Sequence, residues 1–126
     1  MATSSSGEFA RLTPHIKAAL AHAGDTHSPE DVWDAIERGH AQFWPLKNSV
    51  VVTEIVSYPT GRSIRFWLAG GDLEELLMVE PFIVDWAAET HGCNRAEIIG
   101  RAGWVKALPE YRDAARVLVK EIYIDE

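Results

Sequence analysis

A β-rich stretch in the middle of the chain constrains the fold more than any other feature. Residues Ser49–Tyr58 are mostly β-branched, and Ser63–Leu68 alternates apolar with polar side chains. Between them, Pro59-Thr60-Gly61-Arg62 has the composition of a tight turn. Two strand-like runs joined in this way are typical of an antiparallel hairpin. We therefore predict a hairpin over residues 49–68.

Two helix-start signals precede this hairpin. Thr13-Pro14 suits a capping residue followed by the first residue of a helix, and Ser28-Pro29 repeats the pattern. The polar residues before the first signal predict a flexible tail over residues 1–11. The rest of the chain, residues 12–126, has the length of a single domain with one core.

An edge strand and a long helix flank the hairpin. Pro45 fits poorly inside a sheet, so residues 41–46 predict a short edge strand. After the hairpin, Asp72 is placed to cap a helix, and Glu75 completes a capping-box pattern. Gly92 ends the helical pattern, and Pro81 predicts either a kink or a break into two helices.

The last third of the chain continues the alternation of strands and helices. Residues 96–99 predict a short buried strand, and residues 101–108 predict a short helix. Asp113–Ile124 is rich in β-branched residues and favours a strand, although Ala114-Ala115 also suits the start of a helix. The predicted order is α-α-β-β-β-α-β-α-β, which gives an α/β fold with a mixed sheet and helices on its faces.

Charge and composition narrow the range of partners. The net charge of −7 disfavours binding to a nucleic-acid backbone. No apolar run is long enough to cross a bilayer, and the first residues lack the pattern of an export signal. Cys93 is the only cysteine, so no internal disulfide forms and a reducing compartment is the simpler interpretation. We therefore expect neither a nucleic acid nor a membrane as partner.

The order of elements resembles the GNAT acyltransferase superfamily over roughly Phe43 to Ile122. Four stretches look closer still to small GNAT-like proteins of tailed bacteriophages. These stretches are Val52–Val56, Phe66–Asp72, His91–Cys93 and Ile98–Trp104. The resemblance implies a GNAT-like fold and a tailed-phage protein. We expect a structural component of the virion if a phage encodes the chain, and a cytoplasmic protein otherwise.

In active members of the superfamily, a glycine turn holds the pyrophosphate of acetyl-CoA through its backbone amides. The matching stretch here is Leu68, Ala69, Gly70 and Gly71, with its glycines more closely spaced than in the family pattern. Asp72 also places a carboxylate where a phosphate would sit. A tyrosine that serves active members as a general acid is matched by Trp104, whose indole N–H is no proton-transfer acid. The resemblance thus implies a degraded cofactor site and a non-catalytic protein.

The alternative is an acyl-CoA-dependent N-acetyltransferase that binds acetyl-CoA at the same four residues. Glu54 would then be its general base, because active members can place a carboxylate on this central strand. The alternation around Glu54 equally suits an exposed strand position.

Two further groups of residues have chemical potential but weak patterns. His22, Asp25 and His27 lie close together and suggest a metal-dependent enzyme, yet they flank Gly24 in a predicted loop, where we expect solvated side chains and no metal. His91 and Cys93 suggest a base and a nucleophile. A helix-end histidine beside a buried structural thiol explains this second pair more simply.

Aromatic residues predict an interaction surface. Most of the five tryptophans should lie in the core. Trp67 differs because Phe66 and Leu68 are expected on the opposite face of its strand. Exposed together, Trp44 and Trp67 would form a patch suited to a protein partner. We therefore expect other proteins as partners, phage virion proteins among them, and an oligomer.

Overall fold

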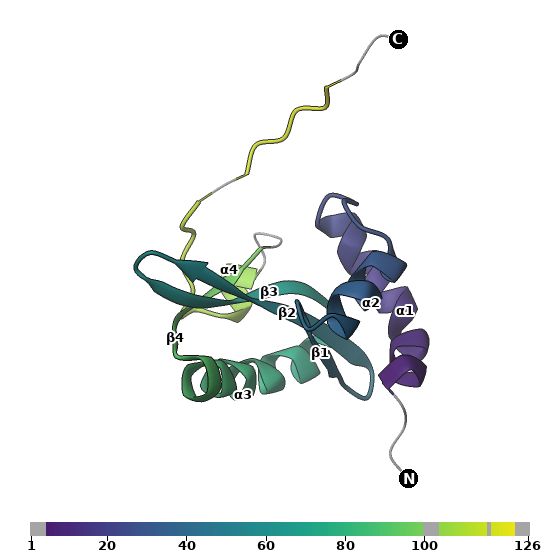
Figure 1. Cartoon of the computed structure of the whole chain (residues 1–126), viewed down its shortest axis with the longest axis horizontal. Helices are drawn as coiled ribbons and strands as arrows, with labels where there is room; N and C mark the ends of the chain where they lie inside the picture. The colour runs from purple at the N-terminus through teal and green to yellow at the C-terminus, as the bar shows by residue number, and fades with distance from the viewer. Residues whose placement is uncertain (1–4, 100–103, 116, 123–126) are drawn as a thin grey trace.

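The structure is a computed structural model, and it describes residues 5–99, 104–115 and 117–122 (Figure 1). Its elements in chain order are helix α1 (Ser5–His22), helix α2 (Pro29–Glu37), strand β1 (Gln42–Pro45), strand β2 (Ser49–Tyr58), strand β3 (Gly61–Gly71), helix α3 (Leu73–His91), strand β4 (Cys93–Ile98) and helix α4 (Trp104–Ala107). The predicted mixed α/β class is confirmed. The described elements follow the predicted order as far as α4.

A mixed sheet with the strand order β1-β2-β3-β4 forms the centre of the molecule. β1 and β3 each pair antiparallel with β2, whereas β4 runs parallel to β3. The predicted hairpin and the proline-containing edge strand are both confirmed. β3 is longer than expected, because its ladder with β2 continues through Gly71.

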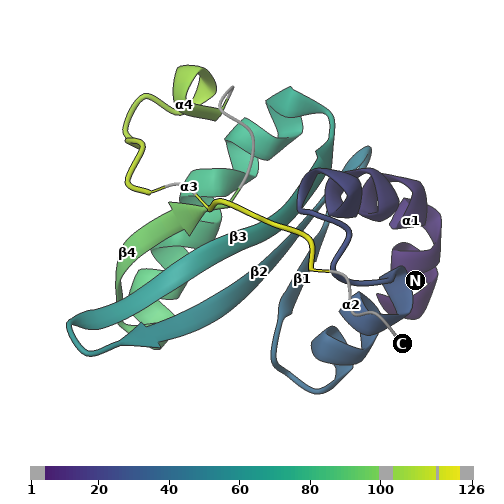
Figure 2. The same ribbon diagram turned by 90° about the horizontal axis from the view of Figure 1, so that it is seen from above.

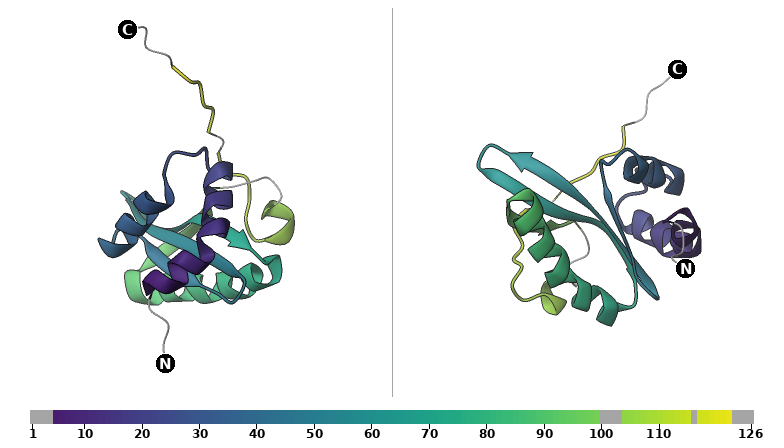
Figure 3. Two further views of the ribbon diagram at one scale, coloured as in Figure 1. Left: turned by 90° about the vertical axis from the view of Figure 1, so that its right-hand side faces the viewer. Right: turned by 60° about the horizontal axis from the view of Figure 1, so that its bottom comes forward.

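The helices cover both faces of this sheet. α1 and α2 pack on one face and α3 packs on the other (Figures 2 and 3). The run Val50-Val51-Val52 is buried throughout, because successive strand residues point to opposite faces and each face has its own apolar cluster. The α1–α2 cluster includes Phe9, Leu12, Ile16, Leu20, Val32, Val50, Val52 and Leu68. The α3 cluster consists of Val51, Ile64, Phe66, Leu76, Ile83 and Ala87.

Helix α1 begins earlier than its sequence signal indicates. It starts at Ser5, so the prediction of a flexible tail is wrong for residues 5–11, and Pro14 lies inside the helix. Thr13 is not the cap, since its hydroxyl donates to the Phe9 carbonyl oxygen at 2.8 Å. Phe9 is buried against Trp33, with ring centroids 5.0 Å apart. This packing outweighs the cost of an internal proline.

The caps of the other long helices are those that the sequence predicts. Ser28 accepts the Asp31 N–H at 3.2 Å, and Asp31 accepts the Ser28 N–H at 2.9 Å, which completes a capping box on α2. Asp72 caps α3, and Gly92 ends it with φ of 65°. α3 continues through Pro81, so the predicted break into two helices does not occur.

The C-terminal third differs most from expectation. β4 begins at Cys93 and is a half-exposed edge strand, not a buried strand over residues 96–99. The predicted helix over residues 101–108 is shorter, and residues 100–103 lie outside the described part. The predicted final strand is wrong for its described residues, 113–115 and 117–122, which form no regular structure. Figure 1 shows them leaving the body of the molecule, away from any neighbouring strand.

Candidate functional site

The four residues that would bind acetyl-CoA in the alternative function, Leu68 to Gly71, lie within β3 and not in a turn after it. Gly70 pairs with Val50 and Gly71 pairs with Ser49 in the ladder with β2. A Cβ on Gly70 would stand 2.8 Å from the carbonyl oxygen of His15 in α1. Gly71 has φ of +115°, and a Cβ there would overlap the carbonyl oxygen of Asn48. The glycines therefore permit close approach of protein segments, which occupy the space that a phosphate would need.

Side chains of the protein itself cap the first turn of α3. Asp72 accepts the Glu74 N–H at 2.9 Å, and its own N–H donates to the Ser49 hydroxyl at 3.2 Å. Glu75 does not complete a capping box with Asp72. Its carboxylate instead accepts the Ser49 hydroxyl and, at 2.9 Å, the Asn48 N–H. These hydrogen bonds lower the pKa of Glu75. Two carboxylates thus stand at the helix end where an anionic cofactor would bind.

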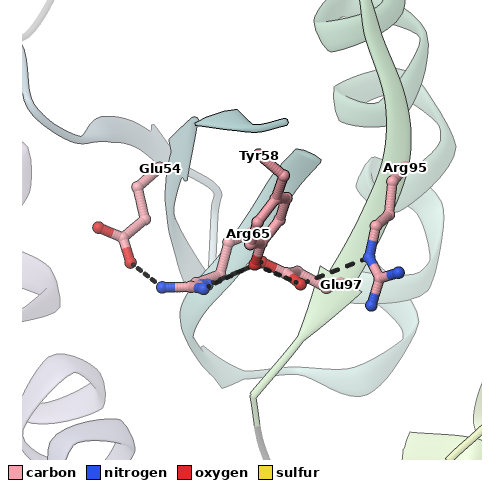
Figure 4. A network of polar contacts seen from close by, with 5 residues as sticks. All are labelled: Glu54, Tyr58, Arg65, Arg95 and Glu97. Atoms are coloured by element: carbon pink, nitrogen blue, oxygen red, sulfur yellow. Dashed lines mark hydrogen bonds and ion pairs between the residues drawn. The ribbon is translucent and has the colours of Figure 1, made fainter. Parts of the chain in front are cut away.

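The most connected polar group among the described residues lies on the face of the sheet opposite α3 (Figure 4), because Ile64 and Phe66, on either side of Arg65 in β3, pack on the α3 face. We call Glu54, Tyr58, Arg65, Arg95 and Glu97 the Arg65 cluster. Arg65 donates to Glu97 at 3.0 Å, to Glu54 at 3.4 Å and to the Tyr58 hydroxyl at 3.2 Å. Glu97 also accepts the Tyr58 hydroxyl at 2.9 Å and pairs with Arg95 at 3.6 Å. The cluster joins three strands across the sheet.

The electrostatics of this cluster keep its charges paired. Partial burial alone would lower the pKa of Arg65, but hydrogen bonds to Tyr58 and Glu97 and the charges of Glu97 and Glu54 raise it above its ordinary value. The guanidinium group therefore stays charged and holds both carboxylates in place. This arrangement favours a structural link between strands over proton transfer.

Glu54, the candidate general base, is not brought near the glycines. Glu54 faces Arg65 across the β2–β3 ladder. Arg65 lies five residues before Gly70 on β3, and five residues of an extended strand span roughly 16 Å. A hollow of about 260 Å³ lies on the α3 side of β4, and Glu54 is not among its lining residues. Residues on that hollow include Ile64, which points to the face opposite Arg65. Glu54 and this hollow therefore lie on opposite faces of the sheet.

Trp44 and Trp67 do not form one patch. Trp44 packs on the α3 side, where its ring lies 5.1 Å from that of Trp86, and its Nε1–H donates to the Thr53 hydroxyl at 3.0 Å. Trp67 packs against the α1–α2 cluster. A β-bulge opposite Val52 and Thr53 explains this, because it leaves Trp67 as an extra residue in β3. The sheet therefore separates the two tryptophans, and the predicted patch is wrong.

The candidate metal ligands are not clustered. His22, Asp25 and His27 are exposed, and the His27 ring lies edge-on to Trp67 at 4.9 Å. In residues 5–99, 104–115 and 117–122, no group of three or more His, Cys, Asp or Glu side chains is placed to hold a metal ion. The hypothesis of a metal-dependent enzyme therefore has no geometric support there.

His91 and Cys93 likewise lack the features of a catalytic pair. The His91 ring packs edge-on against Trp86 at 4.9 Å. Burial raises the pKa of the Cys93 thiol, and the nearby charge of Arg62 only partly opposes this. A thiol with a raised pKa is a poor nucleophile at neutral pH.

Sequence reasoning missed the surface formed by residues 117–122. Val117, Leu118, Val119 and Ile122 each expose between 77 % and 92 % of their surface. The β-rich pattern of this segment predicted a strand of the chain's own sheet, so it gave no sign of exposure. Just before the segment, the Tyr111 hydroxyl donates to Glu80 on α3 at 2.8 Å. This contact holds the chain on α3 six residues before Val117, where the exposed segment begins.

Comparisons with known proteins find no match. No family model, no curated protein and no solved structure matches the chain. Among the described residues, no helix is both long enough and apolar enough to cross a membrane.

Proposed function

We propose that the chain is a non-catalytic interaction protein whose C-terminal segment binds another protein chain. The exposure of four apolar side chains in residues 117–122 carries this proposal. Full burial of one such side chain is worth about 1.5–3 kcal/mol, so a partner that covers this row gains substantial binding energy. An extended β-branched segment is also the form in which chains add a strand to the sheet of a partner.

The resemblance to small GNAT-like phage proteins extends this proposal to a setting. The chain is then a component of a tailed-phage virion if a phage encodes it, and a cytoplasmic protein otherwise. Its partners are other proteins, virion proteins in the first case. Mass spectrometry of purified particles tests this, because absence of the chain from virions would rule out the structural component.

The N-acetyltransferase is the competing function, and the surroundings of Gly70 and Gly71 argue against it. Both glycines pair in the β2–β3 ladder, and Asp72 and Glu75 occupy the adjacent helix end. Calorimetric titration with acetyl-CoA and with CoA should give no binding at millimolar ligand. Micromolar binding, together with slowed amide exchange over residues 68–71, would overturn the proposal in favour of the enzyme.

The role of the segment is tested by comparing three forms of the full chain. A partner protein should be captured in stoichiometric amount by the unaltered chain and by Met78→Asp, but not by Leu118→Asp. Met78 is the matched control because it is an apolar side chain on α3 with 79 % exposure, outside the segment. Equal capture by all three forms would refute a role for the segment in binding.

A further inference from the structure

We propose that two copies of the chain exchange their C-terminal segments. Residues 113–122 of each copy add a strand to the free edge of β4 in the other. This inference rests on the proposed function, because it names the partner of the same segment as a second copy of the chain.

The donor is a strand in composition that pairs with none of the described strands of its own chain. Its described residues are extended and irregular, and Figures 1 and 3 show them projecting away from the sheet. Val117 and Val119 alternate with Leu118 and Lys120, so both faces of a ladder would carry apolar groups. An apolar strand that its own sheet leaves uncovered is suited to pairing with another chain.

The acceptor is the outer edge of β4. In the described part of the chain, β4 pairs with β3 alone and offers six residues without a proline. The opposite edge strand, β1, has four residues and ends at Pro45, which has no N–H to donate. β4 is therefore the edge that can accept a full ladder of hydrogen bonds. On its α3 side, the half-buried Ala96 and Ile98 offer apolar neighbours to an added strand.

Exchange between two copies follows because one chain holds both donor and acceptor. The Tyr111–Glu80 hydrogen bond holds the start of the segment on α3, and the chain then departs from its own β4 instead of turning back along it. Residues 113–122 can span about 33 Å when extended, which exceeds the length of β4. Reciprocal addition uses the segment and the β4 edge of both copies in a two-fold dimer, so neither is left to recruit a third copy through the same contact.

The test is the mass of the full chain in solution, measured by light scattering over a range of concentrations. We expect a dimer that dissociates on dilution. Val119→Pro removes one ladder donor and should raise the dissociation constant about tenfold or more, and Leu118→Asp should do the same. Met78→Asp should leave it unchanged. All three positions are exposed, so the variants should fold, and circular dichroism checks this.

Hydrogen exchange identifies the surfaces that meet. Amides of β4 and of residues 113–122 should be protected together in the dimer, and both should lose protection in Val119→Pro. A monomer at every concentration, or a dimer that persists in both segment variants, would overturn the proposal that two copies exchange their C-terminal segments. A monomer whose segment is protected would also overturn it, since the strand would then lie on its own β4. A monomer that still captures a different protein through Leu118 would overturn only this inference and leave the proposed function standing.

Discussion

The carbonyl oxygen of His15 lies 2.8 Å from the point where a side chain on Gly70 would begin. This contact brings the backbone of α1 onto β3, at the end of the strand where the chain turns toward α3. A glycine at this position is therefore explained by packing between two elements of the protein. No ligand is needed to account for it, which separates Gly70 from the glycines of a phosphate-binding turn.

Gly70→Ala should lower the free energy of unfolding by about 1–3 kcal/mol, because its Cβ would force α1 away from the sheet. Urea denaturation measures the change. Gly7→Ala, on the exposed first turns of α1, makes the same chemical change and should leave stability equal or up to about 1 kcal/mol higher. Equal stability of Gly70→Ala and the unaltered chain would show that the close approach is not tight in solution.

Glu75→Gln should destabilise the protein at neutral pH and have little effect in acid. The pKa of Glu75 is lowered in the folded protein by the Ser49 and Asn48 hydrogen bonds. Its stabilisation is therefore complete above the unfolded value of 4.5 and is lost as the pH falls through the lower folded value. Urea midpoints from about pH 7 to about pH 3 measure this convergence.

The neighbour Glu74 provides the control for that experiment. It is exposed, and the contact at its position is made by its backbone N–H, which Asp72 accepts. Glu74→Gln should give a smaller loss at neutral pH than Glu75→Gln. A gap between Glu75→Gln and the unaltered chain that stays constant in acid would contradict the assigned role of the carboxylate.

Local sequence signals predicted the parts of the fold that depend on near neighbours. The hairpin over residues 49–68 follows from strand composition around a turn, and the caps at Ser28 and Asp72 depend on residues two or three positions away. The early start of α1 depends instead on Phe9 packing against Trp33, a contact between two helices. Local propensity contains no information on that contact.

The candidate site was predicted less well for the same reason. Gly70-Gly71 has the composition of a turn, but pairing with β2 keeps it in the strand. The bulge beside Trp67 breaks the alternation from which its exposure was inferred. The Arg65 cluster gathers residues from three strands, and its register is set by pairing that no single stretch reveals.

Tyr111→Phe should loosen the chain after α4 from α3. The Tyr111 hydroxyl donates to Glu80, and its pKa is raised well above 10.0 by burial and then by the Glu80 hydrogen bond and charge. Its phenol should therefore stay un-ionised around pH 10, so phenolate absorbance there should be equal in the variant and the unaltered chain. Lower absorbance in Tyr111→Phe would mean that Tyr111 ionises normally and is not held by Glu80.

The Arg65–Glu97 pair should stabilise the attachment of β4 to β3. Both side chains are partly buried, with 26 % and 16 % of their surface exposed, and they lie 3.0 Å apart. A double-mutant cycle with Arg65→Met and Glu97→Gln should give a coupling energy of about 1 kcal/mol. Urea denaturation of the four forms measures it. Arg65→Met removes this contact between β3 and β4, so it should also speed amide exchange in β4, the strand that accepts the segment in the proposed dimer.

Arg95 gives the matched comparison for this cycle. It pairs with the same carboxylate at 3.6 Å, but its side chain is 49 % exposed, so solvent screens the interaction. The Arg95→Met and Glu97→Gln cycle should give less than about 0.5 kcal/mol. Equal coupling in the two cycles would mean that burial does not distinguish the pairs. Coupling near zero in both cycles would mean that β4 is held by its backbone ladder to β3 and that the Arg65 cluster contributes little to the edge that a second copy is proposed to extend.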